Sequence, residues 1–183
     1  NVEGNEGSNQ IRIGGLAALP DGSVPAPDTV TVGGDVLGGD GTATDGNNQI
    51  WVLGGAHVIG KVAGGNGNDS IVLNGATAAV DGAIEGGEGN DTIALMLGKA
   101  ASVAGGAGDD NISLSGATVA GAIDAGEGNN FVTLSAGTAG SVSAGAGVDT
   151  ITLAGATISG AINSGAGNDI INLTSGTVAG GVN

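Results

Sequence analysis

A chain of 183 residues with 41 glycines, one phenylalanine, one tryptophan and no tyrosine lacks the aromatic side chains around which most globular cores are built. Its net charge of −15, with three basic residues, disfavours nucleic acid and anionic lipid as partners. Hydrophobic residues still make up 40% of the chain, which argues against a disordered acidic tail, and no run of about twenty apolar residues predicts membrane insertion.

From the amino terminus, short segments of alternating apolar and polar residues each follow an acidic or amide residue. Asn9 precedes QIRI, Asp28 precedes TVTV and Asn48 precedes QIWV. Residues 14–62 are irregular, because three prolines replace a glycine turn at 20–27 and extra residues at 38–48 predict a protruding loop.

Residues 63–183 repeat the same pattern regularly. The stretch GGNGNDSIVL begins at Gly64, and similar stretches begin at residues 86, 105, 125, 144 and 164. The acidic or amide residue before each strand, which we call the marker, recurs every 19 to 22 residues and predicts an internal repeat. The nine markers are Asn9, Asp28, Asn48, Asp69, Asp91, Asp110, Asn130, Asp149 and Asp169.

One repeat contains two apolar runs separated by a small-residue turn. In residues 105–124, Ile112 and Leu114 alternate with Asn111 and Ser113, the turn SGAT follows, and a second alternating run ends at Ile123. We therefore expect an all-β fold: a parallel β-solenoid of about nine coils, with about 20 residues and two short strands per coil, in one domain spanning residues 1–183. Its core would be thin columns of stacked aliphatic side chains.

The glycine-rich turns also carry a specific motif. GGNGNDSIV, GGEGNDTIA and GGAGDDNIS resemble the nonapeptide GGxGxDxUx of RTX-type calcium-binding repeats, a family of bacterial β-rolls exported by type I systems. The resemblance implies Ca²⁺ between successive turns, held by aspartate carboxylates and glycine carbonyls. The implied ligands are Asp69, Asp91, Asp110, Gly64, Gly65, Gly67, Gly86, Gly87, Gly89, Gly105, Gly106 and Gly108, with Asp149 and Asp169 in less typical turns.

Two departures from the family leave an alternative open. The motif occurs once per coil here and twice per coil in the family, and Asn9, Asn48 and Asn130 stand at marker positions. Asparagine and aspartate would also form a hydrogen-bonded ladder along the solenoid without any metal.

The sequence favours a structural role over catalysis. The single histidine, His57, lies in an ordinary GGAHVIG run, and three basic residues offer little to stabilise an anion. We expect a secreted structural protein such as an adhesin, surface-layer or filament subunit, with a cell-surface polysaccharide as a further possible partner. The alternative is the calcium-dependent repeat region of a type I secreted enzyme or toxin.

Two side-chain arrays suggest other roles. A threonine column at residues 77, 118, 157 and 177 would suit ice binding, but it is too irregular to favour it over stacked hydroxyls. Outward apolar residues at 51, 72, 131 and 170 would suit lateral contact with another solenoid.

The two ends of the chain share the same phase of the repeat, since Val2 and Val182 occupy equivalent positions. Uncapped ends of equal phase predict either that copies stack head to tail or that the chain is cut from a longer array.

Overall fold

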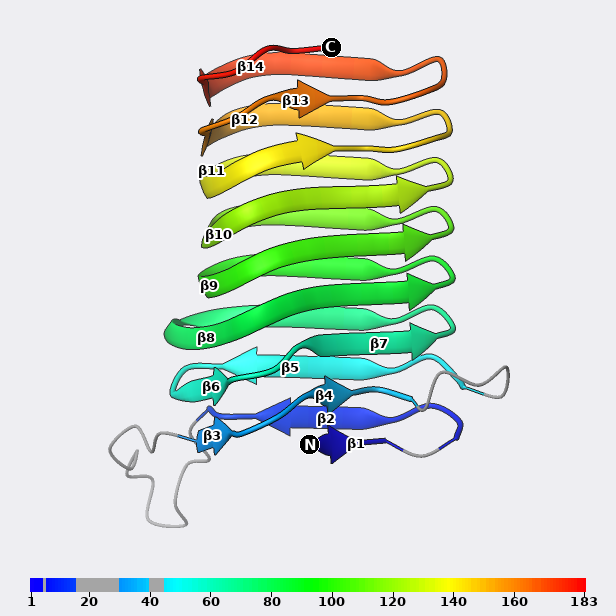
Figure 1. Ribbon diagram of the computed structural model, residues 1–183, viewed down its shortest axis with the longest axis vertical. Coiled ribbons are helices and arrows are strands. Elements are labelled where there is room, and N and C mark those ends of the chain that lie inside the picture. The colour runs from blue at the N-terminus through cyan, green and yellow to red at the C-terminus, as the bar shows by residue number, and fades with distance from the viewer. Residues whose placement is uncertain (5, 16–29, 40–44) are drawn as a thin grey trace.

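The computed structural model describes residues 1–4, 6–15, 30–39 and 45–183, which wind into a stack of coils along one axis (Figure 1). Among these residues every strand ladder is parallel and no helix occurs. The two described ends lie at opposite ends of the stack (Figure 1). The prediction of an all-β parallel solenoid is confirmed. The prolines at 20–27 and residues 40–44 of the predicted loop at 38–48 lie outside the described residues.

Within the residues that the structure describes, fourteen strands form one sheet that wraps around the core. They are β1 Val2–Glu3, β2 Gln10–Ile13, β3 Val30–Val32, β4 Val36–Leu37, β5 Gln49–Leu53, β6 Ala56–Val58, β7 Val62–Asn66, β8 Ser70–Glu88, β9 Thr92–Ala107, β10 Asn111–Glu127, β11 Phe131–Ser143, β12 Thr150–Ile158, β13 Ile162–Asn163 and β14 Ile170–Val178.

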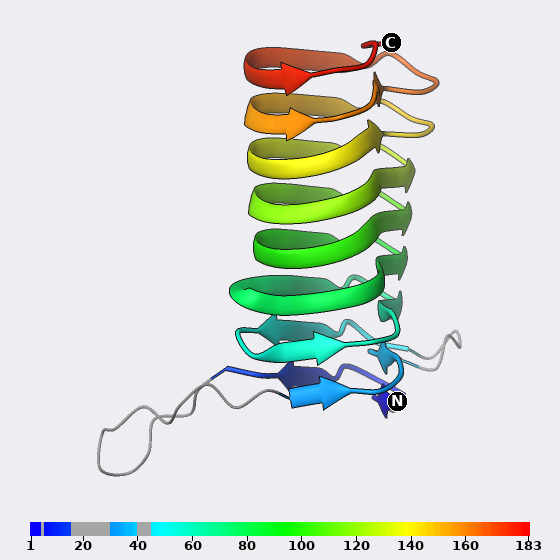
Figure 2. The ribbon, with the colours of Figure 1, turned by 60° about the vertical axis from the view of Figure 1, so that its left-hand side comes forward.

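The regular part of the stack makes six turns between Val62 and Val182, with about 20 residues in each turn. The prediction of two short strands per coil is too simple, because β8, β9 and β10 are single strands of 19, 16 and 17 residues that bend around the coil (Figure 2). Pairing with the neighbouring coils resumes after each bend, and the bends appear as register shifts such as that after Leu114. Because adjacent coils bend at the same place, the hydrogen-bonded ladder between them continues past the bend.

The prediction of nine coils is wrong, because the strands that follow the markers Asn9 and Asn48 lie in adjacent coils. β2 pairs directly with β5, so that Gln10 lies beside Gln49. Val30–Val32, predicted to follow a marker at Asp28, pairs instead with Ala56–Val58 on the second half of the coil. Asp28 itself lies outside the described residues.

The core consists of four aliphatic columns, one residue of each per coil. Ile112 and Leu114 are fully buried, whereas Asn111 is exposed and Ser113 is half-buried, as the alternation predicts. A buried side chain of this size contributes about 1.5–3 kcal/mol, so each coil depends on its neighbours to cover its few apolar residues. In the coil of β10 the columns are occupied by Ile112, Leu114, Val119 and Ile123, with Ala117 and Ala125 filling the corners.

We expect Leu114→Asp to lower the free energy of unfolding by more than about 4 kcal/mol, because it places an unpaired charge and a cavity in a column one side chain thick. Ser113→Asp, which adds the same charge on the outward face of the same strand, should cost little. Urea unfolding followed by circular dichroism measures both, and equal losses would contradict the inward and outward assignment.

Candidate functional site

The marker side chains form a row of hydrogen bonds inside the edge of the solenoid. In each coil from Asn48 to Asp169, the Oδ1 atom of the marker accepts the backbone N–H of the marker in the preceding coil. The N–O distances along the row lie between 2.6 and 3.0 Å. Asp91 and Asp149 are 1% and 0% exposed, so the row belongs to the core and not to the surface. The markers in the row are Asn9, Asn48, Asp69, Asp91, Asp110, Asn130, Asp149 and Asp169.

A second, exposed row runs beside the first and was not recognised from the sequence. In the coils from Asn47 to Asn129, the residue before the marker accepts, through Oδ1, the backbone N–H of its equivalent in the following coil, as Asn90 does from Asp109 at 2.9 Å. The two rows therefore link the coils in opposite directions. The dipeptides NN, ND, ND, DD and NN ending at the markers contained the signal. The acceptors are Asn47, Asn68, Asn90, Asp109 and Asn129.

The second side-chain atom of the marker distinguishes asparagine from aspartate. Asn130 donates from Nδ2 to the carbonyls of Gly126, Gly128 and Ala144, at 3.4, 3.2 and 3.1 Å. The aspartates place Oδ2 at the same point of the side chain, and it is buried with no hydrogen-bond partner within the described structure in Asp69, Asp91, Asp110 and Asp149. These four oxygens require a proton or a cation, because an unpartnered buried polar atom costs about 1–3 kcal/mol.

Burial acts on the same four carboxyl groups. Desolvation raises the pKa of Asp69 to about 6, although hydrogen bonds with Asn48 partly oppose it. Desolvation likewise raises the pKa of Asp91 to about 7 and that of Asp110 to about 6, and it raises the pKa of Asp149. In each case burial outweighs the backbone N–H that the carboxylate accepts.

The glycines of the motif are explained by close packing. A Cβ on Gly86 would collide with Oδ2 of Asp91 and with the Gly105 carbonyl of the next coil. Gly106 has φ of +123° and a Cβ there would overlap the Gly87 carbonyl, so the turn accepts only glycine at this position. The glycine column thus lets the turns of successive coils lie in direct backbone contact.

The calcium ligand set implied by the resemblance stays a prediction. Ca²⁺ takes six to eight oxygens at about 2.3–2.6 Å. Each buried aspartate offers one oxygen, Oδ2, that has no hydrogen-bond partner among the described residues, and backbone carbonyls would have to supply most of the remaining ligands. Within the described residues, no three His, Cys, Asp or Glu side chains come together as a metal-binding group.

The other sequence candidates lie away from this row. His57 Nε2 lies 2.8 Å from Asp81 Oδ2, and both side chains are about half exposed. The threonine column occurs, but its register is Thr118, Thr138, Thr157 and Thr177, so Thr138 belongs to it and Thr77 does not. Phe131 and Ile170 are 48% and 53% exposed, whereas Trp51 and Val72 are half buried.

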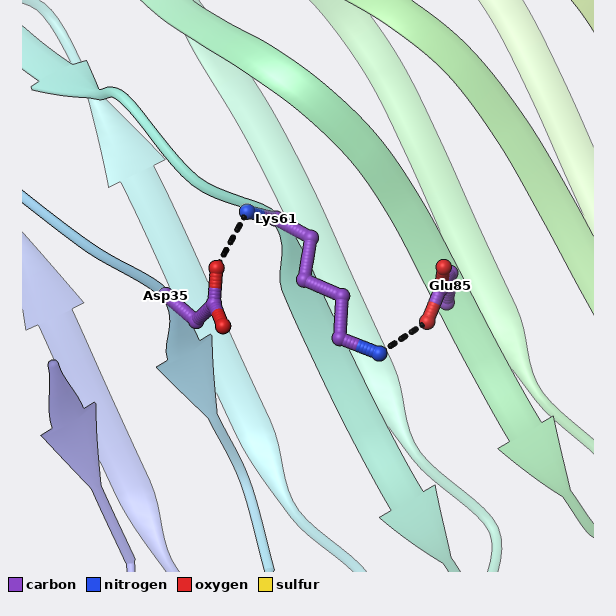
Figure 3. Close-up of polar contacts among 3 residues, drawn as sticks. All are labelled: Asp35, Lys61 and Glu85. Atoms are coloured by element: carbon purple, nitrogen blue, oxygen red, sulfur yellow. Dashed lines mark hydrogen bonds and ion pairs between the residues drawn. The ribbon is translucent and has the colours of Figure 1, made fainter.

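A groove of about 540 Å³ lies on the face formed by β4, β7, β8 and the end of β9. Its basic residue, Lys61, bridges three coils, since its backbone N–H donates to Asp35 Oδ1 at 3.0 Å and its Nζ donates to Glu85 Oε2 at 2.7 Å (Figure 3). An ion pair this exposed contributes about 0–1 kcal/mol. Because Glu85 engages the ammonium group, Lys61 is not a free cation for an anionic ligand.

Comparison with known proteins adds no relative: no family model, curated protein or solved structure matches this chain. Among the described residues there is also no helix with the length and apolar character needed to cross a membrane.

We expect Gly106→Ala to destabilise the protein by roughly 2–4 kcal/mol, since the new methyl group meets both an unfavourable φ and the Gly87 carbonyl. Gly54→Ala is the control, because its nearest neighbour would be 3.8 Å away and its φ is ordinary. Thermal unfolding compares the two, and tolerance of Gly106→Ala would mean that the turns are not in backbone contact.

Proposed function

We propose that the chain is a load-bearing rod in a secreted bacterial structural protein, such as an adhesin, a surface layer or a filament. The observation that carries this proposal is that the regular coils from Asn68 to Val148 are each tied to the next by the same three devices. These are a parallel backbone ladder, four apolar columns and two rows of side-chain hydrogen bonds that run in opposite directions. A stack whose successive interfaces are alike resists bending and local opening.

Composition supports a location outside the cell. The chain has no cysteine to oxidise, and its net charge of −15 keeps rods apart and soluble.

Force spectroscopy on the full chain tests the mechanical role. We expect extension to proceed in discrete steps of one coil, about 20 residues or roughly 65–70 Å of contour length each, because a released coil exposes the next. A chain that stretches smoothly at low force, without steps, would contradict the load-bearing role.

A second candidate is the repeat region of a type I secreted enzyme or toxin, folding only outside the cell. The motif match supports it, as do the four buried oxygens without a partner among the described residues. The activity would then lie elsewhere in a longer protein, and a catalytic domain encoded beside this segment would favour this candidate over the first.

We also propose that copies stack end to end. Leu173 in the last described coil is 52% exposed, whereas Leu134 and Leu153 in the same column are 0% and 2% exposed. A further coil, from the same or another chain, would cover it.

Electron microscopy and sedimentation over a wide concentration range test this stacking. We expect filaments one solenoid wide that are lost in Leu173→Asp, while Ile170→Asp on the outward face keeps them. Monomers at every concentration would contradict the proposal.

A further inference from the structure

We propose that Asn68 and Asn90 are sites of N-linked glycosylation, at which the side-chain amide nitrogen takes a sugar from a glycosyl diphosphate. Both residues belong to the exposed row at the edge of the solenoid. The inference concerns a modification of that edge and does not depend on the proposed function.

The acceptor pattern for this modification is Asn-X-Ser or Asn-X-Thr, where X is not proline. It occurs as NDS at residues 68–70, between β7 and β8, and as NDT at residues 90–92, between β8 and β9. It also occurs at Asn111 and Asn172, which lie within β10 and β14. A transferase has to draw the acceptor segment into its own site, which a turn allows more readily than a strand held in the ladder. We therefore place the modification at Asn68 and Asn90.

The two atoms of each amide group have separate roles. Asn68 Oδ1 accepts the backbone N–H of Asn90 at 2.8 Å, and Asn90 Oδ1 accepts the backbone N–H of Asp109 at 2.9 Å. Neither Nδ2 atom donates a hydrogen bond to any of the described residues, and both side chains are exposed. A glycosylated amide keeps its carbonyl oxygen, so the modification leaves the row of hydrogen bonds intact.

The buried marker row has the opposite arrangement. Asn130 is 2% exposed, and its Nδ2 donates to the carbonyls of Gly128 and Ala144 at 3.2 and 3.1 Å. A glycosyl donor cannot reach this nitrogen while the turn is closed. An exposed amide nitrogen is therefore a property of the outer row and not of the marker row.

Within the outer row, the hydroxyl residue distinguishes the two proposed acceptors. Asn47 and Asn129 are also exposed and also accept through Oδ1, but Gln49 and Phe131 stand two positions after them. Asp109 has no amide nitrogen. Asn47 and Asn129 are thus natural controls with the same geometry and without the motif.

The hydroxyl groups of Ser70 and Thr92 lie on the outward face. Each is followed by a fully buried isoleucine, Ile71 or Ile93, so the strand alternation directs the hydroxyl away from the core. Ser70 and Thr92 are also paired in register across the two coils. The acceptor amide and the hydroxyl of each motif are therefore both presented on the outside of the solenoid.

The reaction is a glycosyl transfer without oxidation or reduction. Nδ2 forms a bond to the anomeric carbon of the sugar, and the bond from that carbon to the diphosphate oxygen breaks. The diphosphate leaves with the electron pair, and one amide proton passes to a base of the transferase. Successive coils lie about 4.8 Å apart, so sugars on both asparagines would crowd each other and we expect most chains to carry one.

Mass spectrometry of the full chain, purified from the cells that produce it, tests the proposal. We expect chains heavier by a sugar, with the addition mapped to Asn68 or Asn90 and absent from Asn47 and Asn129. An amidase that cleaves the glycosylamine bond should remove the sugar and leave aspartate at the modified position. The proposal is overturned if neither Asn68 nor Asn90 carries a sugar, or if Asn129 carries one without the motif.

Three variants separate the motif from simple exposure. Ser70→Ala should abolish the sugar at Asn68 and Thr92→Ala the sugar at Asn90, while the asparagines and their hydrogen bonds remain. Thr150→Ala is the matched control, because Thr150 occupies the same outward column without a preceding asparagine acceptor.

A gain of function tests the same point without removing anything from the edge. Phe131→Thr completes the motif at Asn129, and because Phe131 is 48% exposed the fold tolerates the change. We expect a new sugar at Asn129. Circular dichroism verifies that each variant is folded, and a folded Phe131→Thr that stays unmodified at Asn129 would contradict the proposal.

Two sources of the glycosyl diphosphate are distinguished by transfer to the purified, unmodified chain. One arm supplies a nucleoside-diphosphate hexose with the soluble fraction of the producing cells, and the other supplies a polyprenyl-diphosphate sugar with their membranes. Transfer to Asn68 or Asn90 in either arm supports the proposal and identifies the donor. Absence of transfer in both arms would overturn it.

Discussion

In-register parallel pairing of each coil with the next is the constraint on which the rest of the structure depends. It forces equivalent residues into columns about 4.8 Å apart, so any feature of one coil is repeated against itself. Stacking equal residues buries apolar side chains against one another, whereas it brings like charges, or Cβ atoms at a tight turn, too close together. The same stacking explains why glycine occupies the tight turn at Gly87 and Gly106. It also explains why the carboxyl group of Asp91 points inward and is buried.

The marker row shows how the chain reconciles polar side chains with this rule. A single Oδ1 per coil satisfies the backbone N–H of its neighbour, and the outer row repeats the device in the other direction. Asparagine completes the arrangement with its amide, as Asn130 does. In the aspartates at positions 69, 91, 110 and 149, Oδ2 is buried with no hydrogen-bond partner among the described residues, so these coils satisfy the row less completely than the asparagine coils do.

The periodic part of the fold could be predicted from the sequence, because alternation and spacing report directly on stacked columns. Ile112, Leu114 and Ile123 are buried as expected. The number of coils could not be predicted, because the first coil carries two insertions relative to the next coil. Thirteen more residues lie between Ile13 and Val30 than between Val52 and Ala56. Five more lie between Gly39 and Gly46 than between Gly65 and Gly67. Together these insertions nearly equal one period, so the sequence spacing imitated an additional coil. The protonation or metal state of the row depends on burial and on carbonyl directions, which spacing does not report.

Those two insertions also indicate which features of a coil are indispensable. Although Asn9 and Asn48 are 39 positions apart in the sequence, Asn9 N–H still reaches Asn48 Oδ1 at 2.9 Å, and Val2, Val36 and Val62 remain in one column. Closing a longer loop costs only about 0.6 kcal/mol per doubling of its length, far less than losing a ladder of backbone pairs. The number of residues in a coil can therefore vary between the strands, whereas the column positions and the marker row cannot. The solenoid is defined by these shared positions and not by a fixed repeat length.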